Sequence, residues 1–136
     1  MSKPPQSDVV TCENIFVEAE NPSKGVVAKV TVARPDKLNA LNSEVSQALK
    51  EACRWATDDD DVRVIIFAGA PPNPPAEGER AKPNAFIAGA DINEFVGIDS
   101  DTIRQRFKSN VWEVIWHLDK PTIAMVDGFA LGGGCE

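Results

Sequence analysis

The sequence is poor in several residue types that would point to particular classes of protein. It has no tyrosine, one histidine, two methionines and three cysteines among its 136 residues. The cysteines, Cys12, Cys53 and Cys135, are odd in number and lack the spacing of a metal site. We therefore expect free thiols in a reducing compartment, cytoplasmic or, in a eukaryote, the mitochondrial matrix. No apolar run reaches the roughly 18 residues of a membrane span, and residues 1–13 lack the apolar segment of a secretory signal.

Basic residues are scarce as well. The chain has 14 lysines and arginines against 21 aspartates and glutamates, a formal net charge of −7. A nucleic-acid-binding protein would usually show a basic patch, so this balance argues against such a partner. The aspartates at 58–61 are interpreted as a solvated helix end, because four consecutive carboxylates point in different directions and make a poor metal site. We expect no nucleic acid, membrane or metal among the ligands.

The apolar patterns that are present indicate an α/β fold. Residues 1–13 are predicted to be a flexible tail and residues 14–136 the core. Apolar runs predict strands at 15–19, 26–32, 62–68, 85–88 and 122–126, the first two forming a hairpin and the last one buried. Helical spacing predicts one helix from Asn42 or Ser43 to about Thr57 and another over 101–118. Because the helical connections are long enough for crossovers, we expect a partly parallel sheet.

The second helix is expected to turn six residues towards the core: Ile103, Phe107, Val111, Val114, Ile115 and Leu118. Residues 71–83 hold five prolines and are predicted to form an irregular surface excursion.

Two short loops, 88–91 and 131–134, are the main candidates for chemistry. Each follows a strand-like run and precedes a helical segment, so each can present free backbone N–H groups. Two such loops could hold one carbonyl oxygen from two sides, as in an oxyanion hole. Close helix–strand packing explains the three consecutive glycines of the second loop equally well.

Glu136 follows the glycine run directly. A carboxylate beside free N–H groups can move protons, although an acid in the first turn of a helix also complements the helix dipole. Other residues that could carry chemistry are more typical of structural roles: His117, Trp55, Trp112, Trp116 and Cys135.

Three segments together resemble the N-terminal part of the crotonase superfamily, and most specifically the enoyl-CoA hydratases. They are residues 34–41 (RPDKLNAL), 85–94 (AFIAGADINE) and 120–136 (KPTIAMVDGFALGGGCE), in the family's order. The resemblance covers roughly residues 14–136. It implies a spiral of ββα units, assembled as a trimer or a dimer of trimers in the complete enzyme.

The resemblance also implies an activity, the reversible addition of water to the double bond of a trans-2-enoyl-CoA. The thioester oxygen would lie between the peptide N–H groups of Ala90 and Gly133, and Glu136 would be the first of two catalytic glutamates. No separate cofactor is implied, because coenzyme A is part of the substrate. Residues expected to contact the substrate are Lys37, Leu38, Ala40, Ala88, Gly89, Asp91, Ile92, Asn93 and Gly132.

The sequence departs from the family pattern in two places. The second catalytic glutamate and the C-terminal half of the domain would lie beyond Glu136, so we expect little activity from this chain alone and a separate fragment or chain as a possible complement. The excursion at 71–83 is longer than the family's usual link, and its Arg80 and Lys82 could face either the CoA phosphates or solvent. Double-bond isomerisation and a non-catalytic role in CoA binding or assembly remain alternatives.

Overall fold

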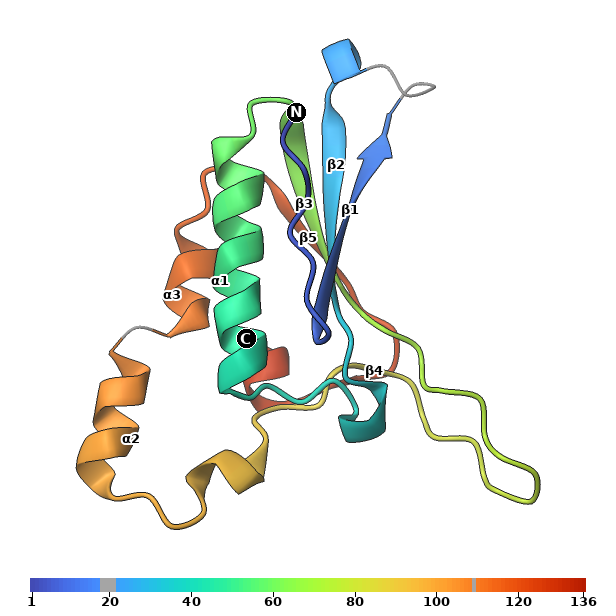
Figure 1. Cartoon of the computed structure of the whole chain (residues 1–136), viewed down its shortest axis with the longest axis vertical. Coiled ribbons are helices and arrows are strands. Elements are labelled where there is room, and N and C mark those ends of the chain that lie inside the picture. Colours follow the sequence, from blue (N-terminus) through green and yellow to red (C-terminus); the bar gives the residue numbers. More distant parts are fainter. Residues whose placement is uncertain (18–21, 109) are drawn as a thin grey trace.

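The computed structural model describes residues 1–17, 22–108 and 110–136. It contains a four-stranded sheet in the order β1-β2-β3-β5 and a separate pair formed by β4 and β6 (Figure 1). The large sheet consists of β1 (Val10–Phe16), β2 (Val26–Val32), β3 (Val62–Gly69) and β5 (Thr122–Met125). β1 runs antiparallel to β2, whereas β2, β3 and β5 are parallel. The predicted α/β class with a partly parallel sheet is confirmed.

The core lies between this sheet and α1 (Ser43–Asp58). β2 alternates buried and half-buried residues along its length, as expected for a strand with one face against a helix. α1 buries Val45, Leu49, Ala52 and Ala56, which recur at helical spacing. Its first turn is capped by the side chain of Asn42, which accepts a hydrogen bond from the N–H of Val45. The predicted start and extent of this helix are confirmed.

The first strand begins earlier than the sequence pattern suggested. β1 starts at Val10, and the side chains of Val10 and Cys12 are buried against the core. Residues 10–13, which we assigned to the tail, therefore belong to the sheet, because β2 offers them a full antiparallel partner. The hairpin is confirmed, while residues 18–21 of the predicted strand and turn lie outside the described residues.

The prediction of one continuous helix over 101–118 is wrong. The chain forms two helices there, α2 (Ser100–Phe107) and α3 (Val111–Trp116). Asn110 begins α3 by accepting a hydrogen bond from the N–H of Glu113, and such a capping side chain competes with helix continuation. Val111 is buried as predicted, but Phe107 and Val114 are exposed. α1 and α3 lie on the same face of the sheet, and α2 lies apart from it (Figure 1).

The C-terminal segment is less buried than predicted. β5 is an edge strand of the large sheet, and all four of its residues are exposed, including Ile123 and Met125. β6 (Phe129–Ala130) pairs in parallel with β4 (Ala85–Ile87). The glycine run then forms a 3₁₀ turn, Gly132–Gly134.

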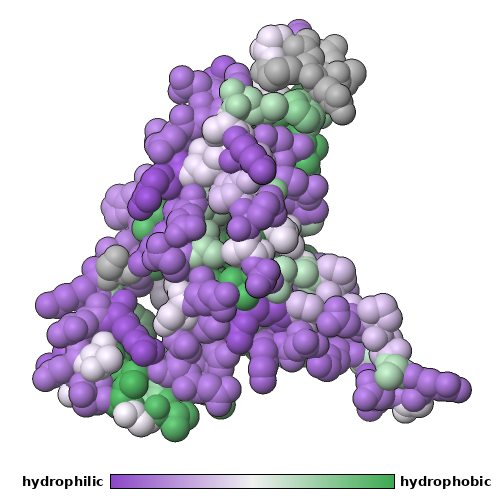
Figure 2. Space-filling model, viewed as in Figure 1, coloured by the Kyte–Doolittle hydropathy of each residue, from purple (hydrophilic) through white to green (hydrophobic). Residues whose placement is uncertain are grey.

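The face of the molecule shown in Figure 2 is mostly hydrophilic. Apolar surface is visible at the lower left of this view and again at the upper end and in the centre. The exposed apolar side chains of the molecule include Ile92 and Phe95 of the 3₁₀ turn Ile92–Phe95 and the following Val96. Within residues 1–17, 22–108 and 110–136, no helix is both long enough and apolar enough to cross a membrane.

Candidate active site

The pairing of β4 with β6 brings the loops 88–91 and 131–134 side by side. Ile87 pairs with Ala130, and the N–H of Leu131 donates to the carbonyl oxygen of Ile87 over 3.1 Å. A Cβ built on Gly89 would lie 3.2 Å from the carbonyl oxygen of Leu131, and one built on Gly132 would lie 3.9 Å from the Cα of Gly89. The two candidate loops are therefore in backbone contact.

The N–H of Ala90 points away from the segment that supports it. The N–H of Leu41 donates to the carbonyl oxygen of Gly89 over 2.8 Å, and the N–H of Asp91 donates to the carbonyl oxygen of Leu41 over 2.7 Å. The described peptide bonds are trans, so the N–H of Ala90 is opposite the carbonyl of Gly89 in the same plane. This N–H is directed away from Leu41.

The direction of the Gly133 N–H follows in the same way from the carbonyl group of the preceding residue, Gly132. The carbonyl oxygen of Gly132 accepts hydrogen bonds from the N–H groups of Cys135 (2.9 Å) and Glu136 (3.3 Å), so it points forward along the turn. The N–H of Gly133, on the other side of that peptide plane, points out of the N-terminal end of the turn. Each loop thus presents one N–H that faces away from its own supporting contacts.

Close packing explains the glycines of the second loop as well. A Cβ on Gly133 would lie 2.3 Å from Cζ2 of Trp112, and a Cβ on Gly134 would lie 2.0 Å from the carbonyl oxygen of Ile87. Close packing of the glycine run is therefore confirmed, and it is compatible with an N–H of Gly133 that points out of the turn. Trp112 also donates from Nε1 to the carbonyl oxygen of Gly133 over 2.9 Å. No local sequence pattern predicts this contact, because the two residues are 21 positions apart and on different elements.

The segment 34–41 is folded tightly around Asn39. Leu38 and Asn39 both have left-handed backbone conformations, with φ of 51° and 57°. Asn39 is only 1% exposed, and its Nδ2 donates to the carbonyl oxygens of Ala70 (2.9 Å) and Ala85 (2.8 Å). Asparagine tolerates this conformation better than most residues, and here its amide joins the loop to two strand ends. Sequence analysis did not single it out.

The same segment is joined to the first candidate loop. The carbonyl oxygen of Leu38 accepts from the N–H of Ala88 over 3.1 Å. Arg34 forms an ion pair with Asp91, with Nη2 3.0 Å from Oδ2. The hydrogen bond from Arg34 and, to a smaller extent, that from the N–H of Asn93 hold the pKa of Asp91 below its ordinary value.

The predicted substrate contacts on these two segments differ in exposure. Gly89 is buried, and four residues are half-buried: Leu38, Ala40, Ala88 and Asp91. Lys37, Ile92 and Asn93 are exposed.

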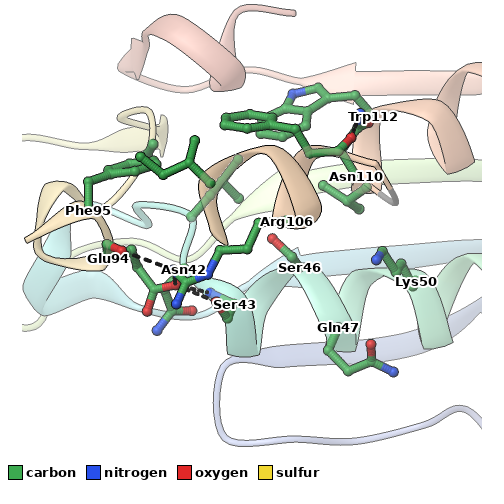
Figure 3. Close-up of a pocket in the computed structure, with 15 residues that line it drawn as sticks. Asn42, Ser43, Ser46, Gln47, Lys50, Glu94, Phe95, Arg106, Asn110 and Trp112 are labelled. Carbon is green, nitrogen blue, oxygen red and sulfur yellow. Dashed lines mark hydrogen bonds and ion pairs between the residues drawn. The ribbon is translucent and has the colours of Figure 1, made fainter. Parts of the chain in front are cut away.

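Two cavities flank the candidate loops. The smaller, of about 190 Å³, lies between α1, α2 and the start of α3 and includes Ala90 in its lining (Figure 3). The larger, of about 530 Å³, lies under α3 and includes Gly133 and Glu136. Three residues line both cavities: Leu41, Val111 and Trp112. Ala90 thus lines the smaller cavity, and Gly133 and Glu136 line the larger one.

A hydrogen-bonded cluster closes one end of the smaller cavity. The carboxylate of Glu94 accepts from the N–H of Ser43 (3.1 Å) and from its hydroxyl, and Nη1 of Arg106 donates to the same carboxylate (3.4 Å) and to the carbonyl oxygen of Glu94 (2.9 Å). Figure 3 shows these three side chains converging from α1, α2 and the turn between them. The rest of the lining is mostly apolar and aromatic, including Phe95, Ile103 and Phe107.

The remaining candidates lie outside this arrangement. His117 is exposed at the end of α3, with Nδ1 2.7 Å from the carbonyl oxygen of Glu113. The excursion at 71–83 protrudes from the molecule, and its Lys82 lies 3.6 Å from Asp36 (Figure 1). Arg80 is exposed on the same excursion. Within the part of the chain that the structure describes, no group of three or more histidine, cysteine or acidic side chains could hold a metal ion.

The comparison with known proteins agrees with this geometry. The sequence model of the family described as "Enoyl-CoA hydratase/isomerase" matches residues 22–136. The chain belongs to this family. The "Short-chain-enoyl-CoA hydratase" of Clostridium acetobutylicum is 39% identical over 127 residues, which cover 90% of this chain and 42% of that protein. The "Crotonyl-CoA hydratase" of Syntrophomonas wolfei is 34% identical over 126 residues, which cover 91% and 43%.

Solved structures show the same fold. The enoyl-CoA hydratase of Thermoplasma volcanium superposes with a TM-score of 0.70 at 31% identity, covering 96% of this chain and 44% of that one. An enoyl-CoA hydratase/carnithine racemase from Magnetospirillum magneticum gives 0.74 at 27% identity, covering 95% and 42%. The predicted crotonase-like fold is confirmed, and the chain spans between 42% and 44% of the length of these relatives.

Proposed function

We propose that the chain provides the thioester-binding part of an enoyl-CoA hydratase site. The peptide N–H groups of Ala90 and Gly133 form the oxyanion hole, and Glu136 is a catalytic carboxylate. The observation that carries the proposal is the contact between loops 88–91 and 131–134, each with one N–H directed away from its own support. The printed names of the relatives, which include a crotonyl-CoA hydratase, support the same activity.

The chemistry suits such a site. When water adds to a 2-enoyl thioester, negative charge develops on the thioester oxygen, where two fixed N–H donors stabilise it. Removing one such donor typically costs about 10²–10³ in rate. Glu136 would take a proton from the attacking water, whose oxygen bonds to C3, while C2 receives a proton from an acid. The family resemblance places a second catalytic glutamate outside these 136 residues, and in this proposal that glutamate supplies the proton.

The substrate would enter along segments 34–41 and 88–93. Ala90 borders the smaller cavity, whose apolar and aromatic residues, among them Phe95, Ile103 and Phe107, suit contact with an acyl chain. Lys37 and Lys82, which lies 3.6 Å from Asp36, are exposed cations at segment 34–41 that could meet the CoA phosphates, and Arg80 is an exposed cation on the same excursion as Lys82. Coenzyme A enters as part of the substrate, so this site requires no further cofactor.

Activity is tested by the hydration of crotonyl-CoA, followed through the loss of the conjugated enoyl absorbance. Since the relatives are longer, the assay uses the 136-residue chain both alone and continued by the corresponding remainder of the Clostridium relative. We expect Glu136→Gln to lower turnover about 10²–10⁴-fold, while Glu113→Gln, an exposed acid on α3, leaves it within about twofold. The proposal is contradicted if neither the 136-residue chain nor the continued chain turns over crotonyl-CoA, or if Glu136→Gln turns over as fast as the unsubstituted enzyme. Double-bond migration in a 3-enoyl-CoA as the main activity would favour the isomerase alternative.

Assembly and location are further parts of this proposal. The family resemblance implies a trimer or a dimer of trimers. This assembly would also require the C-terminal part that the longer relatives contain. Native mass measurement on the 136-residue chain and on the continued chain tests this assembly. We propose a cytoplasmic location, or the mitochondrial matrix in a eukaryote, because free thiols suit a reducing compartment; cell fractionation tests this.

A further inference from the structure

We propose that Arg34 is a positioning residue that fixes the direction of the Ala90 N–H, an inference that rests on the function proposed above. Leu41 and Ala90 form an isolated parallel β-bridge, and the guanidinium of Arg34 has one contact on each of the two bridged segments. Nη1 donates to the carbonyl oxygen of Ala40 over 2.7 Å, and Nη2 donates to Oδ2 of Asp91 over 3.0 Å. Ala40 precedes Leu41 and Asp91 follows Ala90, so one side chain spans both segments where they meet.

The direction of the Ala90 N–H depends on the relative position of these two segments. The peptide plane between Gly89 and Ala90 is held by the hydrogen bond from the N–H of Leu41 to the carbonyl oxygen of Gly89. If Leu41 shifts along or away from the loop, this plane rotates and the N–H rotates with it. Gly89 has a φ of 105° and no side chain to restrict the rotation, so the restraint must come from neighbouring residues.

Arg34 is itself held firmly. Its N–H donates to Oδ1 of the buried Asn39 over 2.9 Å, and its carbonyl oxygen accepts from the N–H groups of Lys37 (3.0 Å) and Asn39 (2.9 Å). The side chains of Arg34 and Asp91 are 16% and 11% exposed, against 27% and 59% for Lys29 and Glu13 in an ion pair on the β1–β2 hairpin. A planar guanidinium can join two acceptors in fixed directions, which the single ammonium group of lysine does less well.

Binding of a CoA phosphate is a less suitable role for Arg34. Both of its terminal nitrogens already have acceptors within the protein, and most of the side chain is shielded from solvent. Charge pairing with Asp91 also leaves little net charge for an external anion. The geometry assigns Arg34 to the support of the loop instead of to the ligand.

The test measures how strongly the bound thioester carbonyl is polarised. Crotonyl-CoA labelled with ¹³C at the carbonyl is bound to the 136-residue chain, and the carbonyl stretch is read by isotope-edited infrared difference spectroscopy. Hydrogen bonds from an oxyanion hole lower this frequency relative to free ligand. The variants are Arg34→Lys and Asp91→Asn, with Lys29→Gln as the matched control, because it breaks an ion pair of similar length (2.9 Å) away from the loop.

We expect the wild-type chain and Lys29→Gln to give the same downshift. Both Arg34→Lys and Asp91→Asn should lose about half of it or more. The Kd for crotonyl-CoA should change less than about threefold in Arg34→Lys, because Arg34 supports the loop and does not contact the ligand. Asp91→Asn keeps the shape of the side chain, so it serves if Arg34→Lys does not fold. A full downshift in both variants, even with lowered thermal stability, would show that Arg34 is only structural and would overturn the inference. No binding or no downshift in the wild-type chain would instead remove the proposed function, and this inference with it.

Discussion

The indole Nε1 of Trp112 donates a hydrogen bond to the carbonyl oxygen of Gly133 over 2.9 Å, and the six-membered ring lies where a Gly133 side chain would have to go. Trp112 is on α3, whereas Gly133 is in the short turn after β6. This contact fixes the position of the turn relative to the helical layer. It also makes Trp112 part of the wall that both cavities share.

Replacing Trp112 should therefore loosen the second loop. We expect Trp112→Phe to lower the free energy of unfolding by about 1–3 kcal/mol, through the lost hydrogen bond and the poorer fit of the smaller ring. Trp116→Phe is the matched control, because Trp116 is on the same helix but 60% exposed, and it should cost about 0.5 kcal/mol or less. Urea denaturation followed by circular dichroism measures both changes. Equal costs for the two variants would show that the Trp112–Gly133 contact does not stabilise the chain.

The ion pair between Arg34 and Asp91 makes a contribution to stability that depends on pH. Because the folded state lowers the pKa of Asp91 below its ordinary 3.8, the carboxylate stabilises the fold above the pKa of the unfolded chain. That contribution is lost as the pH falls through the lower pKa of the folded state. The difference in unfolding free energy between wild type and Asp91→Asn should be constant from about pH 7 to about pH 5 and shrink below about pH 4.

The control for this pH series is Asp101→Asn. Asp101 is exposed and lies 3.8 Å from Arg104, so its replacement should have little effect throughout the range. Chemical denaturation at each pH provides the free energies. A difference for Asp91→Asn that stays constant into the acid range would contradict the lowered pKa.

The three cysteines should differ sharply in reactivity. Burial raises the pKa of Cys12 to about 11 and that of Cys53 to about 12, whereas Cys135 is exposed. Since the thiolate is the reactive form, iodoacetamide at about pH 8 should modify only Cys135 in the native chain and all three cysteines after unfolding. Intact mass counts the adducts, and Cys135→Ser should give none in the native state. Two or three native adducts would mean that the core around Cys12 and Cys53 opens readily.

Local sequence signals predicted the elements that local interactions determine. The Asn42 cap and the apolar spacing that follows it define α1, and the alternating residues of β2 define a strand with one buried face. The glycine and alanine loops were identified because their positions after strands are visible in the sequence. That the two loops could hold one oxygen together was raised from their small residues, and the family resemblance made their contact an expectation.

Features that depend on distant partners could not be predicted in the same way. Residues 10–13 became strand because β2 pairs with them, and α3 begins anew at Asn110 although the apolar spacing continues through it. Asn39 donates to the carbonyl groups of two residues that are 31 and 46 positions away in the sequence. Trp112 donates to a carbonyl group 21 positions away. Sequence patterns do not show which backbone carbonyl oxygens will accept hydrogen bonds from such side chains.

The proposed oxyanion hole can be tested most directly at the two backbone amides themselves. The chain is labelled with ¹⁵N on alanine and glycine and titrated with butyryl-CoA, and then with its thioether analogue, which has the same groups but no carbonyl oxygen. We predict that the amide protons of Ala90 and Gly133 move downfield with the thioester and not with the thioether. The amide of Gly25, which precedes β2 at the end of the strand away from the candidate loops, should stay unchanged with both. If the Ala90 and Gly133 amides do not move with the thioester, or move equally with both ligands, these N–H groups do not bind the carbonyl oxygen.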